Sequence, residues 1–107
     1  MQITKSINGV PVRLTDERWA HITRGHPEML NQAEEVLRTL NEPDKIQLGD
    51  TRELLALRRY DKTPVTTNKI LVVAYRETSP EDGFIITAYF TSRPSTTRET
   101  LWIRSKP

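Results

Sequence analysis

The 107-residue chain contains no cysteine and two histidines, His21 and His26. Without cysteine, disulfide scaffolds, thiolate zinc sites and cysteine nucleophiles are excluded. No apolar run approaches the roughly 20 residues of a membrane helix, and the first residues lack the apolar core of a signal peptide. We therefore expect a cytoplasmic protein with no membrane contact.

The composition is that of a small folded domain, with 36% apolar and 28% charged residues. We expect one domain over residues 1–107, because no repeat, low-complexity tract or linker interrupts the chain. Residues 1–50 hold six Lys and Arg against eight Asp and Glu, whereas residues 51–107 hold ten against six. The basic second half could attract a polyanion such as RNA. It is equally compatible with an ordinary solvated surface.

The first 41 residues predict a β-hairpin followed by two helices. Residues 2–6 and 10–14 form the hairpin around Asn8-Gly9. Thr15 is a suitable N-cap for a helix that stops at Gly25. Pro27 suits the first position of a second helix. The apolar stripe of that helix is Leu30, Ala33, Leu37 and Leu40.

From residue 45 onward the apolar period changes to two, which is typical of strands. We expect strands at residues 45–49, 53–60, 69–76, 83–91 and 101–104. Turn or loop chemistry separates them at residues 49–51, 62–64, 79–83 and 93–95. The prediction is an α+β fold: an N-terminal strand or hairpin, two helices, then a four- to five-stranded antiparallel sheet. One face of the sheet should pack on the helices and the other should stay open.

Alternation along two strands predicts which side chains reach the open face. In the strand over residues 83–91, one side carries Phe84, Ile86, Ala88 and Phe90, which we assign to the core. The other side carries Ile85, Thr87, Tyr89 and Thr91. In the strand over residues 53–60, we expect Arg58 and Tyr60 to share the ligand-facing side, an assignment that one bulge would reverse.

The two histidines are the natural groups for moving protons near neutral pH. His26 lies between Gly25 and Pro27, so the backbone holds it at a fixed corner. The structural alternatives are that His26 caps the second helix and that His21 is a partly buried histidine bonded to a backbone carbonyl. Because the pair spans Gly25 and has no third ligand at a suitable spacing, we expect no metal site.

RNA cleavage without a metal or other cofactor is within reach of these residues. The 2′-hydroxyl of RNA is an internal nucleophile, a histidine can move its proton, and arginine matches phosphate oxygens with two donors. Hydroxyl groups can hold the phosphate, and tyrosine can stack on a base. His26, Arg58, Thr87 and Tyr89 would make such a site if the fold gathers them.

Several short motifs support this hypothesis by their order along the chain. They are Trp19-Ala20-His21-Ile22, His26-Pro27-Glu28, Asn41-Glu42-Pro43-Asp44, Leu71-Val72-Val73-Ala74-Tyr75 and the strand over residues 83–91. With these motifs, residues 12–104 resemble the phage and mobile-element branch of the barnase–EndoU–colicin–RelE-like nuclease superfamily.

The resemblance implies N-terminal helices followed by a four-stranded antiparallel sheet with RNA on its open face. It also implies a metal-independent endoribonuclease that leaves a 2′,3′-cyclic phosphate, often a toxin restrained by an antitoxin or immunity protein. The catalytic residues that it implies are His26, with His21 as a second candidate, Arg58 or Arg59, Thr87 and Tyr89. Our candidates for substrate binding are Arg59, Tyr60, Tyr75, Thr91 and Arg93.

Two other functions fit the same sequence. The first is a module that binds RNA or protein without cutting, in agreement with the modest net charge and the acidic Glu34-Glu35 pair. The second is an interaction protein whose sheet edge takes a partner strand. We expect a monomer or a weak dimer.

Overall fold

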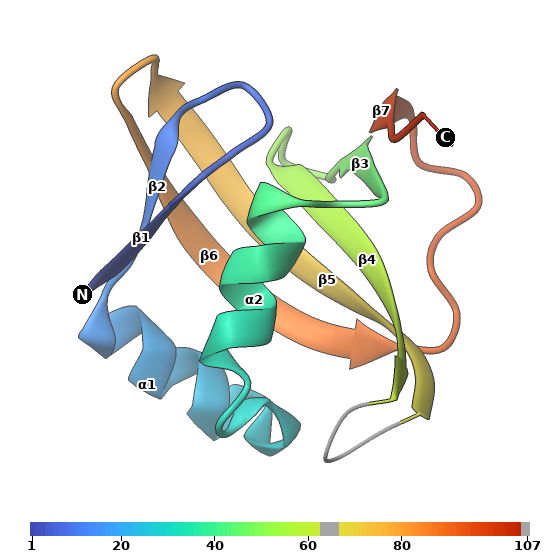
Figure 1. Cartoon of the computed structure of the whole chain (residues 1–107), viewed down its shortest axis with the longest axis horizontal. Coiled ribbons are helices and arrows are strands. Elements are labelled where there is room, and N and C mark those ends of the chain that lie inside the picture. Colours follow the sequence, from blue (N-terminus) through green and yellow to red (C-terminus); the bar gives the residue numbers. More distant parts are fainter. Residues whose placement is uncertain (63–66, 106–107) are drawn as a thin grey trace.

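The computed structural model describes the backbone of residues 1–62 and 67–105 and the side chains of residues 1–60 and 69–105. The described part of the chain has an α+β fold with two α-helices, one 3₁₀ turn and a single seven-stranded sheet (Figure 1). In chain order the elements are β1 (Gln2–Lys5), β2 (Pro11–Leu14), α1 (Asp16–Gly25), η1 (Pro27–Met29), α2 (Ala33–Asn41), β3 (Lys45–Leu48), β4 (Leu54–Lys62), β5 (Thr67–Ser79), β6 (Asp82–Thr91) and β7 (Thr100–Ile103).

The sheet is larger than the sequence predicts, because the N-terminal hairpin joins it. Its strand order is β1-β2-β6-β5-β4-β3-β7. Neighbouring strands are antiparallel except β2 and β6, which are parallel, with Val12 opposite Gly83 and Arg13 opposite Phe84. Arg13 also donates two hydrogen bonds to the Asp82 carboxylate, at 2.9 and 3.0 Å. The expected antiparallel sheet is therefore a mixed one.

The first helix forms as predicted. The Thr15 hydroxyl accepts a hydrogen bond from the backbone N–H of Arg18 at 3.0 Å, which satisfies a free donor of the first turn. Asp16 and Glu17 follow, where the helix dipole favours acids. The helix includes Gly25, and the next residue, His26, closes it by donating its N–H to the Ile22 carbonyl at 2.7 Å.

The second helix begins later than predicted. Pro27 starts only the short 3₁₀ turn η1, and α2 begins at Ala33. Between them Asn31 has a positive φ of 65°, a conformation that no helix can propagate through. The turn buries Met29 and leaves Leu30 56% exposed, so Leu30 does not belong to the apolar stripe of α2.

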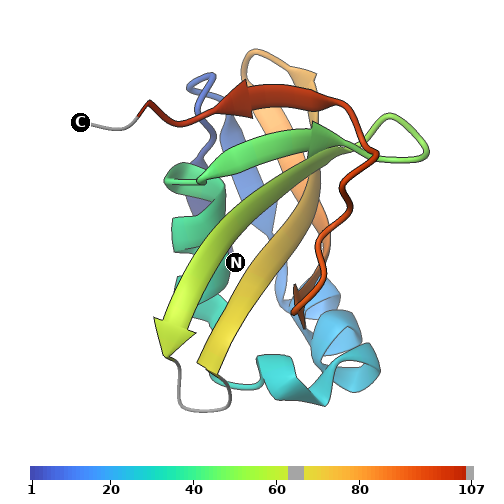
Figure 2. The same ribbon diagram turned by 90° about the vertical axis from the view of Figure 1, so that its right-hand side faces the viewer.

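The two faces of the sheet differ in what covers them. The helices and η1 pack on the helix face, over a core that includes Val36, Leu40, Leu71, Val73 and Ile85. The outer face carries a smaller cluster of Leu55, Leu57, Val72 and Ala74. The connection over residues 92–99 leaves the end of β6 and runs to β7 on the side away from the helices (Figures 1 and 2). No helix covers the outer face, but its cluster is not open as the sequence predicts: Leu57 is 2% and Val72 3% exposed, and residues of the connection lie against this face.

A bulge in β6 changes part of the predicted alternation. The register shifts where Ala74 pairs with Thr87 but Tyr75 pairs with Ile85. As a result Ile85 enters the core on the helix face and Ile86 joins the cluster on the outer face, the reverse of the prediction. Beyond the bulge the prediction holds, since Ala88 lies in the core and Tyr89 on the outer face.

The predicted strand breaks are partly confirmed. The N–H of Gly49 donates to the Glu53 carbonyl at 2.8 Å, which closes the turn between β3 and β4. A tight hairpin pairs Ser79 with Asp82 between β5 and β6. In the predicted break at residues 62–64, Thr63 and Pro64 lie outside the described residues.

Candidate functional site

His26 lies at the rim of the outer face, where α1 ends. Its ring is stacked on the ring of Tyr89, with centroids 5.7 Å apart and an interplanar angle of 29°. Its Nδ1 is 3.7 Å from Oε2 of Glu28, close enough for an ion pair but too long for a hydrogen bond. The side chain is 39% exposed. One ring therefore faces an aromatic partner and a carboxylate while it remains accessible to a ligand.

The fold holds this contact from both sides. Pro27 and the hydrogen bond from His26 N–H to Ile22 fix the backbone of His26. Both α1 and η1 contact β6, the strand that carries Tyr89. The stacked pair is thus held between β6 and the junction of α1 and η1.

A cavity of about 230 Å³ opens beside Tyr89 on the outer face. Tyr89, Thr91, Arg93 and Arg98 line it from β6 and the connection that follows. Thr87, two residues before Tyr89 on the same strand, pairs with the outer-face residue Ala74. The structure therefore brings His26, Thr87, Tyr89, Thr91 and Arg93 to one end of one face.

The connection over residues 92–99 is tied to the sheet by polar contacts. The buried side chain of Gln47 donates through Nε2 to the Ser95 carbonyl at 3.0 Å. The Ser95 hydroxyl in turn accepts from the N–H groups of Thr97 and Arg98, each at 3.2 Å. A hydrogen bond from Arg98 to Asp50 at 2.8 Å raises the pKa of Arg98 and holds its guanidinium at the cavity.

Arg58 and Tyr60 lie on the helix face, so the prediction that they reach the open face is wrong. The Tyr60 hydroxyl shares a hydrogen bond with Thr39 at 3.0 Å and donates to the Glu35 carbonyl of α2 at 3.1 Å. Arg58 stacks its guanidinium over the Tyr60 ring at 5.9 Å and donates to the Glu42 carbonyl. The cause is strand register, because the buried residue Ala56 sets the helix-facing alternation of β4.

Tyr75 and His21 are also apart from the site. Tyr75 is fully buried in the core on the helix face, where it cannot contact a substrate. His21 is exposed on α1 and makes no side-chain hydrogen bond, ion pair or ring contact with the described residues. Of the two histidines, His26 alone contacts Tyr89.

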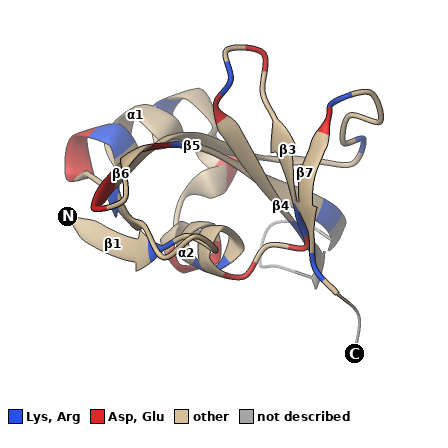
Figure 3. Ribbon diagram, turned by 90° about the horizontal axis from the view of Figure 1, so that it is seen from above, with Lys and Arg blue, Asp and Glu red and all other residues tan. Residues whose placement is uncertain are grey.

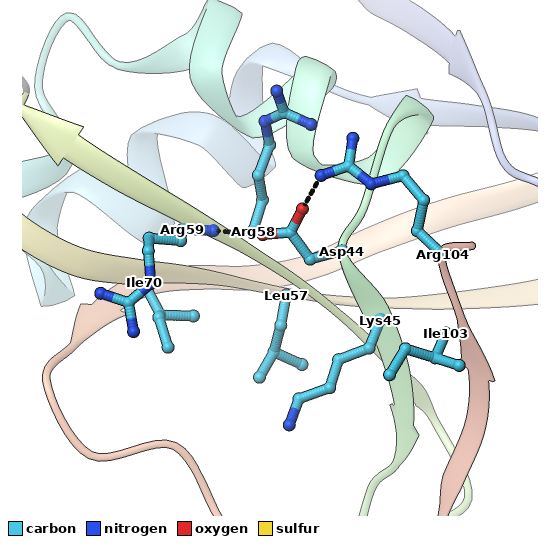
Figure 4. A pocket seen from close by; sticks show the side chains of 8 residues that line it. All are labelled: Asp44, Lys45, Leu57, Arg58, Arg59, Ile70, Ile103 and Arg104. Carbon is cyan, nitrogen blue, oxygen red and sulfur yellow. Dashed lines mark hydrogen bonds and ion pairs between the residues drawn. The ribbon is translucent and has the colours of Figure 1, made fainter. Parts of the chain in front are cut away.

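Arg59 lies on the outer face two strands across the sheet from Thr91, and four cationic side chains surround a second cavity there (Figure 4). It is lined by Lys45, Arg58, Arg59 and Arg104 together with Asp44 and three apolar residues. We call it the basic pocket. Ribbon segments with Lys and Arg lie close together on β4 and just beyond β7 (Figure 3).

The sequence did not single out Glu28, which lies beside His26, or the polar cavity residues Arg98, Gln47, Lys45 and Arg104. The sequence contained a signal only for Glu28, which belongs to the quoted His-Pro-Glu motif. Gln47 and Arg98 both hydrogen-bond to Ser95 in the irregular connection over residues 92–99. Contacts in an irregular segment leave no periodic pattern in the sequence. The acidic residues Glu34 and Glu35 lie on α2, which packs on the helix face.

The arrangement at His26 is suited to proton transfer on a bound anion. A carboxylate beside one imidazole nitrogen stabilises the cation that forms when the other nitrogen takes a proton. Among the described residues, no group of three His, Asp or Glu side chains is placed to hold a metal ion. In the same part of the chain, no helix is long and apolar enough to cross a membrane.

No family model matches this chain. Searches of the curated proteins and of the solved structures found no match either.

Proposed function

We propose that the protein is a metal-independent endoribonuclease of the superfamily that its sequence resembles, with RNA bound on the outer face. The observation that carries the proposal is the triplet of His26, Glu28 and Tyr89. It joins a base, a carboxylate that stabilises its protonated form and an aromatic ring with a hydroxyl. Arg93 and Arg98 line the adjoining cavity, which supplies positive charge for a phosphate.

The reaction needs an internal attack and two proton transfers. His26 takes the proton of the 2′-hydroxyl through Nε2, and the 2′-oxygen forms a bond to phosphorus. The bond from phosphorus to the 5′-oxygen breaks, and that oxygen takes a proton from the Tyr89 hydroxyl. The products are a 2′,3′-cyclic phosphate and a free 5′-hydroxyl, and water then restores both side chains.

The remaining residues hold the substrate and its developing charge. The guanidinium of Arg98 is fixed by Asp50, so it stabilises negative charge on the phosphorane without reorganising. Thr87 and Thr91 flank Tyr89 along β6 and offer hydroxyl donors to phosphate or ribose. Arg93 contributes a second cation at the cavity.

The test is cleavage of mixed RNA, structured and unstructured, in EDTA, with the fragment ends assayed for 2′,3′-cyclic phosphate. We expect wild-type protein to cut and His26→Ala to cut about a hundredfold more slowly, the usual contribution of a catalytic acid or base. His21→Ala is the matched control, since it removes a histidine of α1 that lies outside the site, and it should cut at the wild-type rate. Glu28→Gln should lose activity, because it removes the carboxylate beside Nδ1 of His26.

Other results would contradict the proposal. RNA that stays intact at high protein concentration, but binds and dissociates with rising salt, would indicate a binding module that does not cut. Equal loss of activity in His21→Ala and His26→Ala would show that the stacked pair is not the centre of the reaction.

A further inference from the structure

The basic pocket combines a positive rim with an apolar floor. Its volume is about 250 Å³, near the lower end of small-ligand sites at about 300 Å³. Leu57, Ile70 and Ile103 form the floor, and Ile103 is 68% exposed. Figure 4 shows Arg59 and Lys45 on the same side as Leu57, with Arg58 and Arg104 above Asp44.

Asp44 supplies the one carboxylate that lines the pocket, and both of its oxygens already accept hydrogen bonds. One oxygen of Asp44 accepts from the guanidinium of Arg104, and the other accepts from the backbone N–H of Arg59 at 2.8 Å. Arg58 donates to the Glu42 carbonyl at 2.6 Å. These contacts leave the side chains of Lys45 and Arg59 facing the cavity with no anionic partner among the described residues. A ligand with both negative charge and a flat apolar surface fits the pocket.

Strand register connects the pocket to the stacked pair. Tyr89 pairs with Val72, Val72 with Leu57, and Leu57 with Lys45. The four residues form one row across the outer face, at right angles to the strands. Three strand spacings of about 4.8 Å put Tyr89 and Lys45 about 14 Å apart.

A nucleic acid strand has the right repeat for this row. At a stacked rise of about 3.4 Å per nucleotide, 14 Å is about four nucleotide steps, and fewer if the strand is extended. The middle of the row, Val72 and Leu57, is apolar and almost fully buried, at 3% and 2% exposed, so a nucleic acid strand would pass over the side chains that cover these two residues. A single strand of a few nucleotides can therefore reach both cavities at once.

We propose that the basic pocket is a second nucleotide subsite, in which Lys45 and Arg59 bind a phosphate and a base lies on Ile70 and Ile103. This inference rests on the proposed function, because it takes RNA as the ligand of the outer face. The RNA strand then crosses the β-strands from the cleavage site at β6 to the pocket at β3, β4 and β7. Arg58 and Arg104 line the rim and add to the positive potential.

The subsite makes binding depend on the length of the RNA. The probes are 2′-O-methyl RNAs, a dinucleotide and a hexanucleotide, which lack the attacking hydroxyl and stay intact. Their affinity is measured by fluorescence anisotropy over a range of salt. The double variant Lys45→Gln/Arg59→Gln is compared with Lys5→Gln/Arg18→Gln, which removes two exposed cations from β1 and α1. Circular dichroism and thermal melting check that both variants fold.

We expect wild-type protein to bind the hexanucleotide more tightly than the dinucleotide. In the Lys45→Gln/Arg59→Gln variant, hexanucleotide affinity should fall about tenfold, and the slope of log affinity against log salt should decrease by about 1.4, or 0.7 for each lost phosphate contact. Dinucleotide affinity should not change. The Lys5→Gln/Arg18→Gln control should match wild type with both probes.

The outcomes separate this inference from the proposed function. Equal hexanucleotide affinity in the pocket variant and wild type would overturn the subsite, even if RNA is cleaved. So would binding of neither probe by the wild-type protein. Length-dependent binding that requires Lys45 and Arg59, in a protein that leaves unmodified RNA intact, would support the subsite and overturn the nuclease.

Discussion

Tyr75 and Tyr60 both pack in the core, but they differ in whether the phenol hydroxyl has a hydrogen-bond partner. The hydroxyl of Tyr75 is buried and has no hydrogen-bond partner among the described residues. The hydroxyl of Tyr60 bonds to Thr39 and to the Glu35 carbonyl. Burial raises the pKa of both phenols. A buried polar group without a partner loses its hydration and gains nothing in return.

The two tyrosines should therefore respond oppositely to removal of the hydroxyl. We expect Tyr75→Phe to leave the free energy of unfolding unchanged or to raise it by about 1 kcal/mol. Tyr60→Phe should lower it by about 1 kcal/mol, because two hydrogen bonds to α2 are lost. Urea unfolding of the three proteins measures both changes. A clear loss of stability in Tyr75→Phe would mean that its hydroxyl has a partner in the native protein.

At the same scale, the sequence predicted part of the candidate site. His26 and Tyr89 were predicted to belong to one site if the fold gathers them, and the structure stacks the two rings. Arg58 was predicted on the wrong face, since one residue of register decides between Arg58 and Arg59. Arg98 was missed because its position depends on the Gln47–Ser95 hydrogen bond, a contact between residues far apart in the sequence.

At the scale of elements, the junction of β2 and β6 depends on a glycine. A Cβ on Gly83 would lie 2.5 Å from the Arg76 carbonyl oxygen and 3.3 Å from Cγ2 of Val12. The first contact is with backbone, so the clash can be relieved only by moving β5 or β6. Gly25 at the end of α1 has no atom within 4 Å of the same position.

Replacing each glycine by alanine tests whether stability depends on the close approach of the strands at Gly83. At Gly25, where there is open space, the same change alters only the freedom of the backbone. We expect Gly83→Ala to lower the free energy of unfolding by about 1–3 kcal/mol, the usual range for overpacking. Gly25→Ala should be neutral or should stabilise by up to about 1 kcal/mol, because alanine is the better helix former. Thermal unfolding of both variants is the measurement. Equal changes in the free energy of unfolding for the two variants would show that the strands at the junction of β2 and β6 can move apart at little cost.

The elements also show what periodicity can and cannot predict. The N-cap at Thr15 and the strand periods predicted α1 and the five later strands, because those signals are local. The delay of α2 to Ala33 depends on a left-handed residue, Asn31, and the bulge near Ile86 depends on the pairing with β5. The parallel pairing of β2 with β6 joins segments about 70 residues apart, for which the sequence has no local signal.

On the scale of the whole molecule, the two faces of the sheet have different electrostatic surroundings. The outer face and its rim carry Lys45, Arg59, Arg93 and Arg98, whereas the acidic pair of α2 lies on the helix side. The net charge of +2 therefore understates the attraction that the outer face would exert on the RNA strand of the proposed function.

Cleavage should consequently depend on salt in a length-dependent way. Between about 50 and 200 mM salt, kcat/KM on a long RNA should fall about tenfold or more, because several phosphates are displaced from cations. The fall should be smaller for a dinucleotide, which reaches fewer of these cations. The melting temperature serves as the control and should stay nearly constant over this range. An equal salt effect on both substrates would argue against an extended binding surface.

The parallel pairing of β2 with β6 also determines the order in which the chain can assemble. Hairpin β1–β2 and helix α1 are complete within the first 25 residues, yet Val12 finds its partner strand only at Gly83. Contacts of such long sequence separation slow folding, because a long loop must close before they form. During synthesis, the apolar side chains of β2 remain without their partner strand until most of the chain has left the ribosome. Until β6 is made, the N-terminal hairpin is therefore exposed to premature pairing with other strands.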